Sequence, residues 1–173
     1  IDALNDKSYD LDDEMTVVCD DSGVLGLGGV IGGVPSGCTE DTVNVFIEAA
    51  LFDPIRTATT GRKLQVDSDA RYRFERGIDS AAVVSGVERA TKLVLEICGG
   101  EASEITSAGS QPAWEMTVPF RPNRMKTLGG LDVPAEKSIA ILESLGFGVA
   151  ENSGSGDDQV LTISVPSWRM DVH

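Results

Sequence analysis

One carboxylate in apolar surroundings is the first candidate for chemistry in this chain. Glu48 is the sole charged residue of the run Val43–Phe52. If the run is a strand, Glu48 lies on the face opposite to a row of apolar side chains, those of Val43, Val45, Ile47 and Ala49. Burial of a carboxylate is costly unless a polar group meets it. Two interpretations stay open: a recognition group in a pocket, or, favoured by the spacing alone, an edge-strand residue that reaches water.

Glycines are dense just before this run. Seven lie between positions 20 and 54, and such density among β-branched residues indicates that a backbone or a ligand comes close, because a Cβ would block the approach. A phosphate loop does not fit the spacing. A dinucleotide fingerprint from Gly26 needs glycine where Ile31 stands, and a phosphate loop from Gly32 needs lysine where Cys38 stands. The stretch predicts a glycine-walled pocket beside a buried acid, and no nucleotide site.

Cysteine and histidine usage narrows the chemistry further. The three cysteines are far apart and form no CxxC pair: Cys19, Cys38 and Cys98. This pattern indicates reduced thiols of a cytosolic protein, with neither a zinc site nor a disulfide framework. The single histidine is His173, so catalysis by several histidines is excluded. Because the chain begins at Ile1 without methionine, we interpret it as a piece of a longer polypeptide.

The charge distribution is uneven. The net charge of −14 argues against a general nucleic-acid binder, whose affinity comes mostly from phosphate contacts. Residues 1–53 hold twelve acids and one base, whereas residues 54–79 hold four acids and six bases, which are Arg56, Arg62, Lys63, Arg71, Arg73 and Arg76. This local basic cluster could meet a large anion. From charge alone, a solvated helix face is the first interpretation.

Strands and a turn must position the glycine-rich stretch. Residues 15–19 and 24–30 read as two strands of a hairpin, with Gly23 supplying the positive φ of the turn. A polar connection over 36–41 leads to the expected strand Val43–Phe52.

Three helices are expected next. Asp53 before a proline is a strong helix start, and Gly61 suits the end of that helix. Ser68 can cap a short helix over 69–76. A long helix over 80–98 carries an apolar stripe at i, i+3 and i+4 spacing, which we assign to the core.

The second half of the chain has a different pattern. A small polar stretch, 101–112, is the expected domain boundary. Beyond it we expect a strand, two short helices and a hairpin, over 114–120, 122–128, 134–145 and 147–165. This order is a helix-turn-helix with a wing. Its second helix carries two acids and one lysine, which favours the shape without the DNA function. The predicted fold class is α+β, a layered sheet and helix domain followed by a small winged-helix-like domain.

Several long motifs resemble a known family. They are Arg-Phe-Glu-Arg-Gly-Ile-Asp at 73–79, Leu-Glu-Ser-Leu-Gly-Phe at 142–147 and Val-Pro-Ser-Trp-Arg-Met-Asp at 165–171. With the glycine-rich stretch, they make nearly the whole chain similar to the beta subunit of bacterial phenylalanyl-tRNA synthetases. The resemblance implies that residues 1–110 are the later part of a tRNA-editing domain. Residues 111–173 would be a winged-helix-like domain that is truncated at its C-terminus.

The resemblance also implies an activity and partners. The family pairs with an alpha subunit in an alpha2-beta2 tetramer that attaches phenylalanine to tRNA(Phe) with ATP and magnesium in the cytoplasm. Its ATP sites lie on the alpha subunit, so no cofactor is expected in this segment, and neither a membrane nor DNA is an expected partner. The editing domain hydrolyses tyrosine wrongly attached to tRNA(Phe). Two other readings stay open: a non-catalytic tRNA- or subunit-docking module, and an unrelated carboxylate-pocket binding protein.

Site residues follow by position from the resemblance. Glu48 would receive the tyrosine hydroxyl, Gly29 and Gly32 would leave room for the side chain, and Ser68 and Ala70 would line the pocket. No residue is assigned to catalysis. The family's segment His-Thr-Asp-Ala-Ser reads Asp-Ser-Asp-Ala-Arg at 67–71 here. The family also borrows a pocket histidine from sequence upstream of Ile1.

Two further assignments concern charged ligands. A tRNA 3′ end at the pocket would bring phosphates to four flanking basic side chains, those of Arg56, Arg62, Lys63 and Arg73. Asp171 matches the first carboxylate of a magnesium site whose other ligands follow His173 in the family. Because magnesium is held by several ligands at once, one carboxylate is not expected to bind it tightly.

Overall fold

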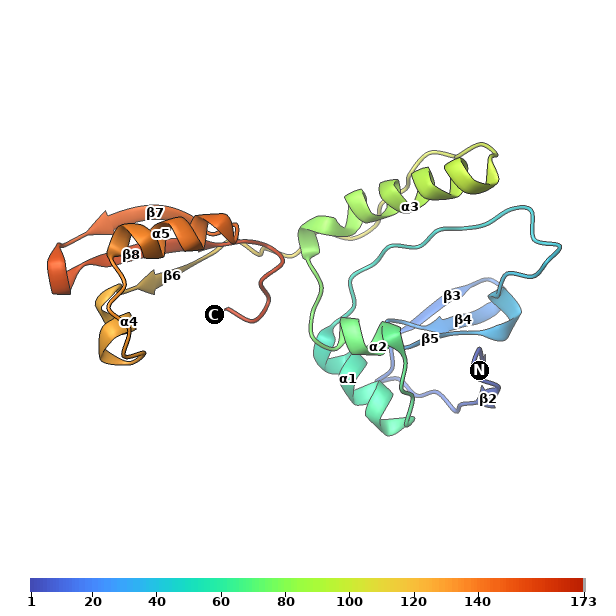
Figure 1. The fold of residues 1–173 in the computed structure, drawn as a ribbon. Helices are drawn as coiled ribbons and strands as arrows, with labels where there is room; N and C mark the ends of the chain where they lie inside the picture. The colour runs from blue at the N-terminus through green and yellow to red at the C-terminus, as the bar shows by residue number, and fades with distance from the viewer. Residues whose placement is uncertain (173) are drawn as a thin grey trace. The chain divides into compact units, whose positions relative to one another are not determined.

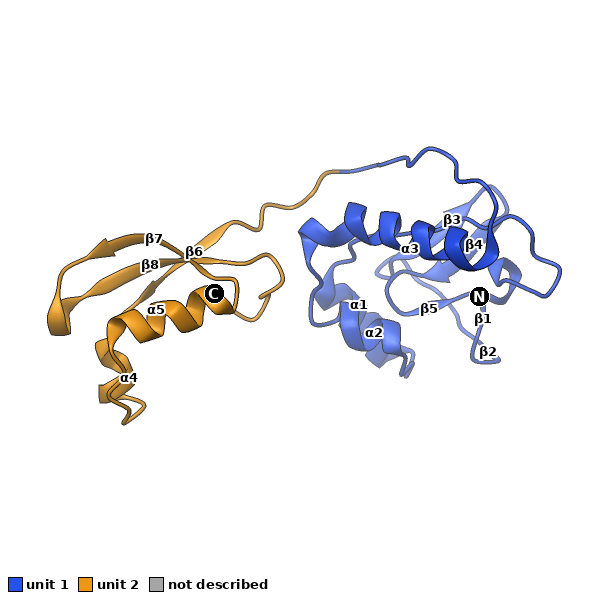
Figure 2. Ribbon diagram, turned by 45° about the horizontal axis from the view of Figure 1, so that its top comes forward, with its two compact units in different colours: residues 1–109 blue, residues 110–173 orange. Residues whose placement is uncertain are grey.

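The computed structural model describes residues 1–172; His173, which the sequence singled out as the one histidine, lies outside them. The chain divides into two compact units, residues 1–109 and 110–173 (Figures 1 and 2). Each combines small antiparallel sheets with helices, which confirms the α+β class. None of the helices over residues 1–172 is long and apolar enough to cross a membrane.

Unit 1 is built on short strands. Its two sheets comprise β1 (Asp2–Ala3) with β2 (Lys7–Ser8), and β3 (Val17–Asp20), β4 (Gly23–Leu27) and β5 (Ile31–Gly32) in that order. The predicted hairpin is confirmed, with Asp20 opposite Gly23 and a φ of 130° at Gly23. One bridge, Ala3 to Gly33, joins the two sheets.

Two helices of unit 1, α1 (Pro54–Lys63) and α2 (Asp69–Phe74), begin where the sequence predicts. The unit also contains η1 (Val34–Ser36), η2 (Ser80–Ala82) and α3 (Val83–Cys98). The Asp53 carboxylate accepts a hydrogen bond from the Arg56 amide at 2.7 Å, and Ser68 Oγ accepts one from the Arg71 amide at 3.1 Å. Both N-caps are therefore confirmed.

The predicted end of α1 at Gly61 is wrong. Gly61 is a buried residue inside the helix, and the Arg71 side chain occupies the space that a Cβ would need. The glycine thus allows close packing of α1 and α2, and α1 continues to Lys63.

The predicted strand Val43–Phe52 is also wrong. This segment is extended but contains no strand, and within residues 1–172 its backbone forms no hydrogen bond to another backbone. Val43 is 88 % and Phe46 is 90 % exposed. Alternation identified an extended conformation, but a strand also needs a neighbouring strand to complete its hydrogen bonds.

The apolar stripe of α3 is not core. The helix ends at Cys98 as predicted, with a φ of 71° at Gly99, but its α-helical part begins at Val83, after the 3-10 turn η2. No residue of α3 is buried, and two residues of the stripe, Val84 and Leu95, are 51 % and 36 % exposed. The core of unit 1 lies instead beside the sheet, where four side chains are buried: Met15, Leu27, Val30 and Val66.

Unit 2 has a closed core. Its elements are β6 (Met116–Phe120), α4 (Asn123–Thr127), α5 (Ala135–Ser144), β7 (Gly148–Ser153), η3 (Gly156–Asp158) and β8 (Val160–Val165). The antiparallel sheet has the order β6-β8-β7, so the last strand is central. Leu161 and Ile163 on β8 are 0 % and 2 % exposed, and Ile139 and Leu142 of α5 pack against this cluster. The order of strands and helices agrees with the predicted helix-turn-helix and wing.

Candidate functional site

A cavity of about 1150 Å³ lies in unit 1. Strands β3 to β5, the extended segment 44–52, α2 and the start of α3 contribute its walls, and Figure 1 shows the extended segment crossing between α3 and the sheet. Four of the five predicted pocket residues line it: Gly29, Gly32, Glu48 and Ala70. Ser68 does not. Its hydroxyl donates a 2.5 Å hydrogen bond to the Val30 carbonyl and holds the sheet to α2.

Glu48 stands at this cavity on a segment open to solvent. Its side chain is exposed, and it forms no hydrogen bond or ion pair with any residue of the described part of the chain. A carboxylate in this position keeps its lone pairs available for a donor that enters the cavity. The two interpretations offered by the sequence are therefore compatible, because Glu48 reaches both water and the cavity.

An aromatic pair that the sequence did not single out forms part of the wall. The rings of Phe52 and Phe74 meet edge to face with centroids 5.1 Å apart, and both residues line the cavity. Phe74 lies one turn after Ala70 on α2, so both side chains share one face. That i, i+4 spacing from a proposed pocket residue is the signal that could have identified Phe74. Phe52 had no comparable signal.

The glycines of the wall are needed for packing by the chain itself. A Cβ at Gly28 would lie 2.6 Å from Phe52, and one at Gly29 would lie 3.1 Å from both phenylalanines. At Gly32 the nearest atom would be a methyl group of Leu4 at 3.0 Å. The space left by these glycines is thus taken by side chains that shape the cavity, and Gly29 also requires its positive φ of 69°.

The four basic residues that were assigned to tRNA binding differ in whether a carboxylate pairs with them. Lys63 forms an ion pair with Asp12; the hydrogen bond lowers the pKa of Asp12 and raises that of Lys63. Across residues 1–172, the remaining three have no carboxylate partner: Arg56, Arg62 and Arg73. The chain contains twice as many acidic as basic residues. Because these three arginines still lack a carboxylate partner among the described residues and lie on two adjoining helices, they are suited to binding an anion.

Asp171, which the resemblance assigns to a magnesium site, is bonded to an arginine of its own chain. Arg169 donates hydrogen bonds of 2.7 and 2.8 Å to the two carboxylate oxygens, and this contact raises the pKa of Arg169. Within residues 1–172, no group of three histidine, cysteine or carboxylate side chains could hold a metal ion. The carboxylate is thus engaged by a cation of its own chain, and no step is assigned to magnesium here.

The three cysteines are free and exposed. Cys19 and Cys38 both line the cavity, a placement that the sequence spacing did not predict.

Comparison with known proteins defines the class. Residues 1–99 match the B3/4 domain and residues 103–173 match the tRNA synthetase B5 domain. The chain therefore belongs to the B3/4 domain family, with a B5 match in its second unit.

The relatives give the particular type of protein. The chain is 51 % identical to the phenylalanine–tRNA ligase beta subunit of Paramagnetospirillum magneticum, over 98 % of this chain and 21 % of that protein. The beta subunits of Gluconobacter oxydans and Rhodospirillum rubrum are each 48 % identical, with 98 % of this chain and 20 % and 21 % of theirs covered. The chain thus spans about a fifth of these relatives. These findings confirm the resemblance drawn from the motifs.

Proposed function

We propose that this chain forms a tRNA-editing pocket of a phenylalanine–tRNA ligase beta subunit, which hydrolyses tyrosine wrongly attached to tRNA(Phe). The observation that carries the proposal is the cavity beside Glu48, in a chain about half identical to proteins of that name. Gly29, Gly32 and Ala70 share the same cavity. We assign substrate binding to these four residues, and a supporting role to Ser68, which fixes α2 to the sheet.

The chemistry of the two amino acids explains why such a pocket is needed. Tyrosine differs from phenylalanine by one hydroxyl. An apolar aminoacylation site rejects an added hydroxyl by only about a hundredfold. A second site must therefore recognise the hydroxyl itself. In this cavity Phe52 and Phe74 offer an aromatic surface to a ring, and Glu48 offers an acceptor to a phenol.

Glu48 would select by accepting a hydrogen bond that phenylalanine cannot donate. A hydrogen bond to a charged group contributes about 1.5–3 kcal/mol, which corresponds to about ten- to a hundredfold in discrimination. The carboxylate would also disfavour phenylalanine, because an apolar ring beside it removes water without replacing the lost hydrogen bond. Its role is recognition. The ester bond would be attacked by a group that we do not assign.

The rest of the ligase would provide the synthetic reaction. We infer an alpha subunit as the partner that uses ATP, tRNA(Phe) as the shared substrate and the cytoplasm as the place of action. The unpaired Arg56, Arg62 and Arg73 are suited to tRNA phosphates, with Lys63 available once its exposed pair with Asp12 opens.

The proposal is tested by Glu48→Ala in the assembled ligase that contains this sequence. We expect the ratio of Tyr-tRNA(Phe) to Phe-tRNA(Phe) deacylation to fall by about ten- to a hundredfold, while phenylalanine activation is unchanged. Glu40→Ala is the matched control, since Glu40 is an exposed acid of the same connection that does not line the cavity. A wild-type ratio in the Glu48 variant would make Glu48 a structural residue and reject the site.

One observation favours a second candidate function, a docking module. The stripe of α3 has no buried residue, and exposed apolar surface on a regular helix is typical of an interface. Leu95 is an exposed member of the stripe. Loss of tRNA charging in a Leu95→Asp variant, with wild-type editing ratios, would favour docking over editing for this helix.

A further inference from the structure

Tyr72 and Arg76 form an exposed stacked pair at the end of α2. The Arg76 guanidinium carbon lies 3.8 Å from the centre of the Tyr72 ring. The same guanidinium donates hydrogen bonds to the Tyr72 carbonyl at 2.5 Å and to Glu75 at 3.2 Å. The arginine is therefore held over the ring by three contacts.

The ring is accessible despite this contact. Tyr72 is 60 % exposed, and the Arg76 side chain is 54 % exposed. The ring therefore keeps a large accessible area beside its contact with the guanidinium. A flat aromatic surface already backed by a cation is the arrangement on which nucleic-acid bases stack in single-stranded complexes.

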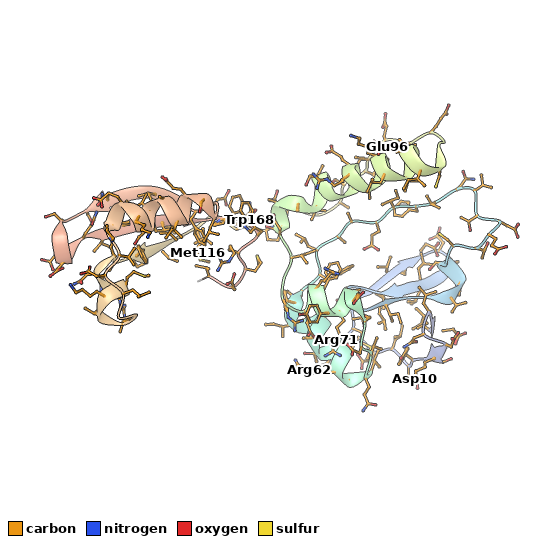
Figure 3. All side chains as sticks on the ribbon, viewed as in Figure 1. Asp10, Arg62, Arg71, Glu96, Met116 and Trp168 are labelled. Carbon is orange, nitrogen blue, oxygen red and sulfur yellow. The ribbon has the colours of Figure 1, made fainter. Side chains whose placement is uncertain are left out.

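The surroundings supply positive charge. Arg73 follows Tyr72 directly, and Arg62 lies on α1, which packs against α2. Figure 3 shows Arg62 and Arg71 on these two neighbouring helices. Arg71 is used internally, by a 2.7 Å bond to the Val66 carbonyl and an ion pair with Glu75, whereas Arg62 and Arg73 are available to an outside anion.

We propose that Tyr72 and Arg76 form a stacking platform for an unpaired RNA base, with Arg62 and Arg73 neutralising the adjoining phosphates. The proposal rests on the proposed function for the identity of the RNA, the 3′ end of a tRNA. Within α2, Ala70 and Phe74 face the cavity, and Tyr72 is two residues, about 200°, away from Ala70 around the helix. The stacked base therefore belongs to a nucleotide upstream of the one that carries the amino acid.

The test measures binding of a fluorescent single-stranded RNA, which ends in ACCA and carries no amino acid, to the 173-residue chain. Binding is followed by anisotropy at several salt concentrations. Tyr72→Ala should weaken binding by about 5- to 150-fold without changing the slope of log affinity against log salt, because stacking releases no counterions. Tyr72→Phe should bind like wild type. Arg73→Gln should weaken binding and reduce the slope by about 0.7.

Two controls separate stacking from general attraction. Lys137→Gln removes an exposed positive charge from unit 2 and should change neither the RNA affinity nor the slope of its salt dependence. A duplex of the same sequence should bind equally to wild type and Tyr72→Ala, since its bases are already stacked. The platform is rejected if wild type does not bind the RNA at low salt, if Tyr72→Ala binds normally, or if its loss is as large for the duplex.

Failure of the platform and failure of editing are distinguishable. The RNA carries no amino acid, so its binding does not depend on recognition of the tyrosine hydroxyl, and a failed editing assay leaves the stacking result standing.

Discussion

The two units have buried apolar clusters of equal size, but their longest helices contribute differently to them. In unit 2 the central strand β8 places Leu161, Ile163 and Val165 in the core, and α5 covers them. In unit 1 the buried cluster also has four members, but no described residue of its longest helix, α3, belongs to it or is among the residues packed against it. Unit 1 uses its remaining apolar surface to line a cavity of about 1150 Å³. The difference indicates that unit 2 is organised for stability, whereas unit 1 keeps apolar surface available for a ligand or partner.

The largest expected effect comes from removing the centre of the unit 2 core. Leu161→Ala should lower the free energy of unfolding of unit 2 by about 2–5 kcal/mol, because it leaves a cavity around a fully buried position. Urea unfolding followed by tryptophan fluorescence measures this unit selectively, since both tryptophans, Trp114 and Trp168, belong to it.

The matched control is Leu93→Ala in α3, followed by far-UV circular dichroism. Leu93 is half exposed, so we expect a cost below about 1 kcal/mol. If both substitutions cost the same, α3 is packed in solution and the contrast between the units fails.

A smaller effect is expected at the cavity wall. Gly28→Ala places a methyl group 2.6 Å from Phe52 and should destabilise unit 1 by about 1–3 kcal/mol through overpacking. Circular dichroism during urea unfolding measures the loss. Adding Phe52→Leu should restore part of it. An additive further loss in the double variant would show that the ring is not the obstacle.

A gain is expected on α3. Gly86 lies inside the helix with no atom within 4 Å of its missing Cβ, so Gly86→Ala should stabilise α3 by about 0.5–1 kcal/mol. The opposite signs at Gly28 and Gly86 would separate the packed wall from the open helix. Destabilisation at Gly86 would instead mean that the start of α3 is covered in solution.

The smallest expected effect is electrostatic. The pKa of Asp12 is lowered from 3.8 by its hydrogen bond with Lys63, so its contribution to stability is complete above the unfolded value and is lost as pH falls through the folded value. Acid titration of unit 1 should therefore show a small loss of stability below about pH 4. Asp12→Asn should remove that dependence. If the Asp12→Asn variant loses stability at acidic pH as the wild type does, other carboxylates cause the loss.

Local chemistry made parts of unit 1 predictable. Asp53 and Ser68 cap their helices through bonds to amides three residues on, and Gly23 and Gly99 adopt the positive φ that ends a strand or helix. Each of these features depends on neighbours in sequence.

Features that depend on distant partners were not predictable. Alternation over Val43–Phe52 could not show that no strand of the described chain pairs with it, and the stripe of α3 could not show that none of its residues is fully buried. For the candidate site, the sequence offered Glu48 as a chemical possibility, and the resemblance added Gly29, Gly32 and Ala70. The contact between Phe52 and Phe74 emerged only from packing, because Phe52 has no sequence signal that links it to Phe74.

The unpaired backbone of residues 43–52 also affects how the cavity can be entered. Within residues 1–172 this wall is fixed beyond its two ends, by Ser36 bonded to the Leu25 carbonyl and by the Asp53 cap. Displacing it outward breaks no backbone hydrogen bond, so the barrier to admitting a bulky molecule comes from side-chain contacts alone. Because Glu48 belongs to the same segment, the carboxylate would move with the wall. A ligand that hydrogen-bonds to Glu48 would therefore favour the return of this segment over the cavity.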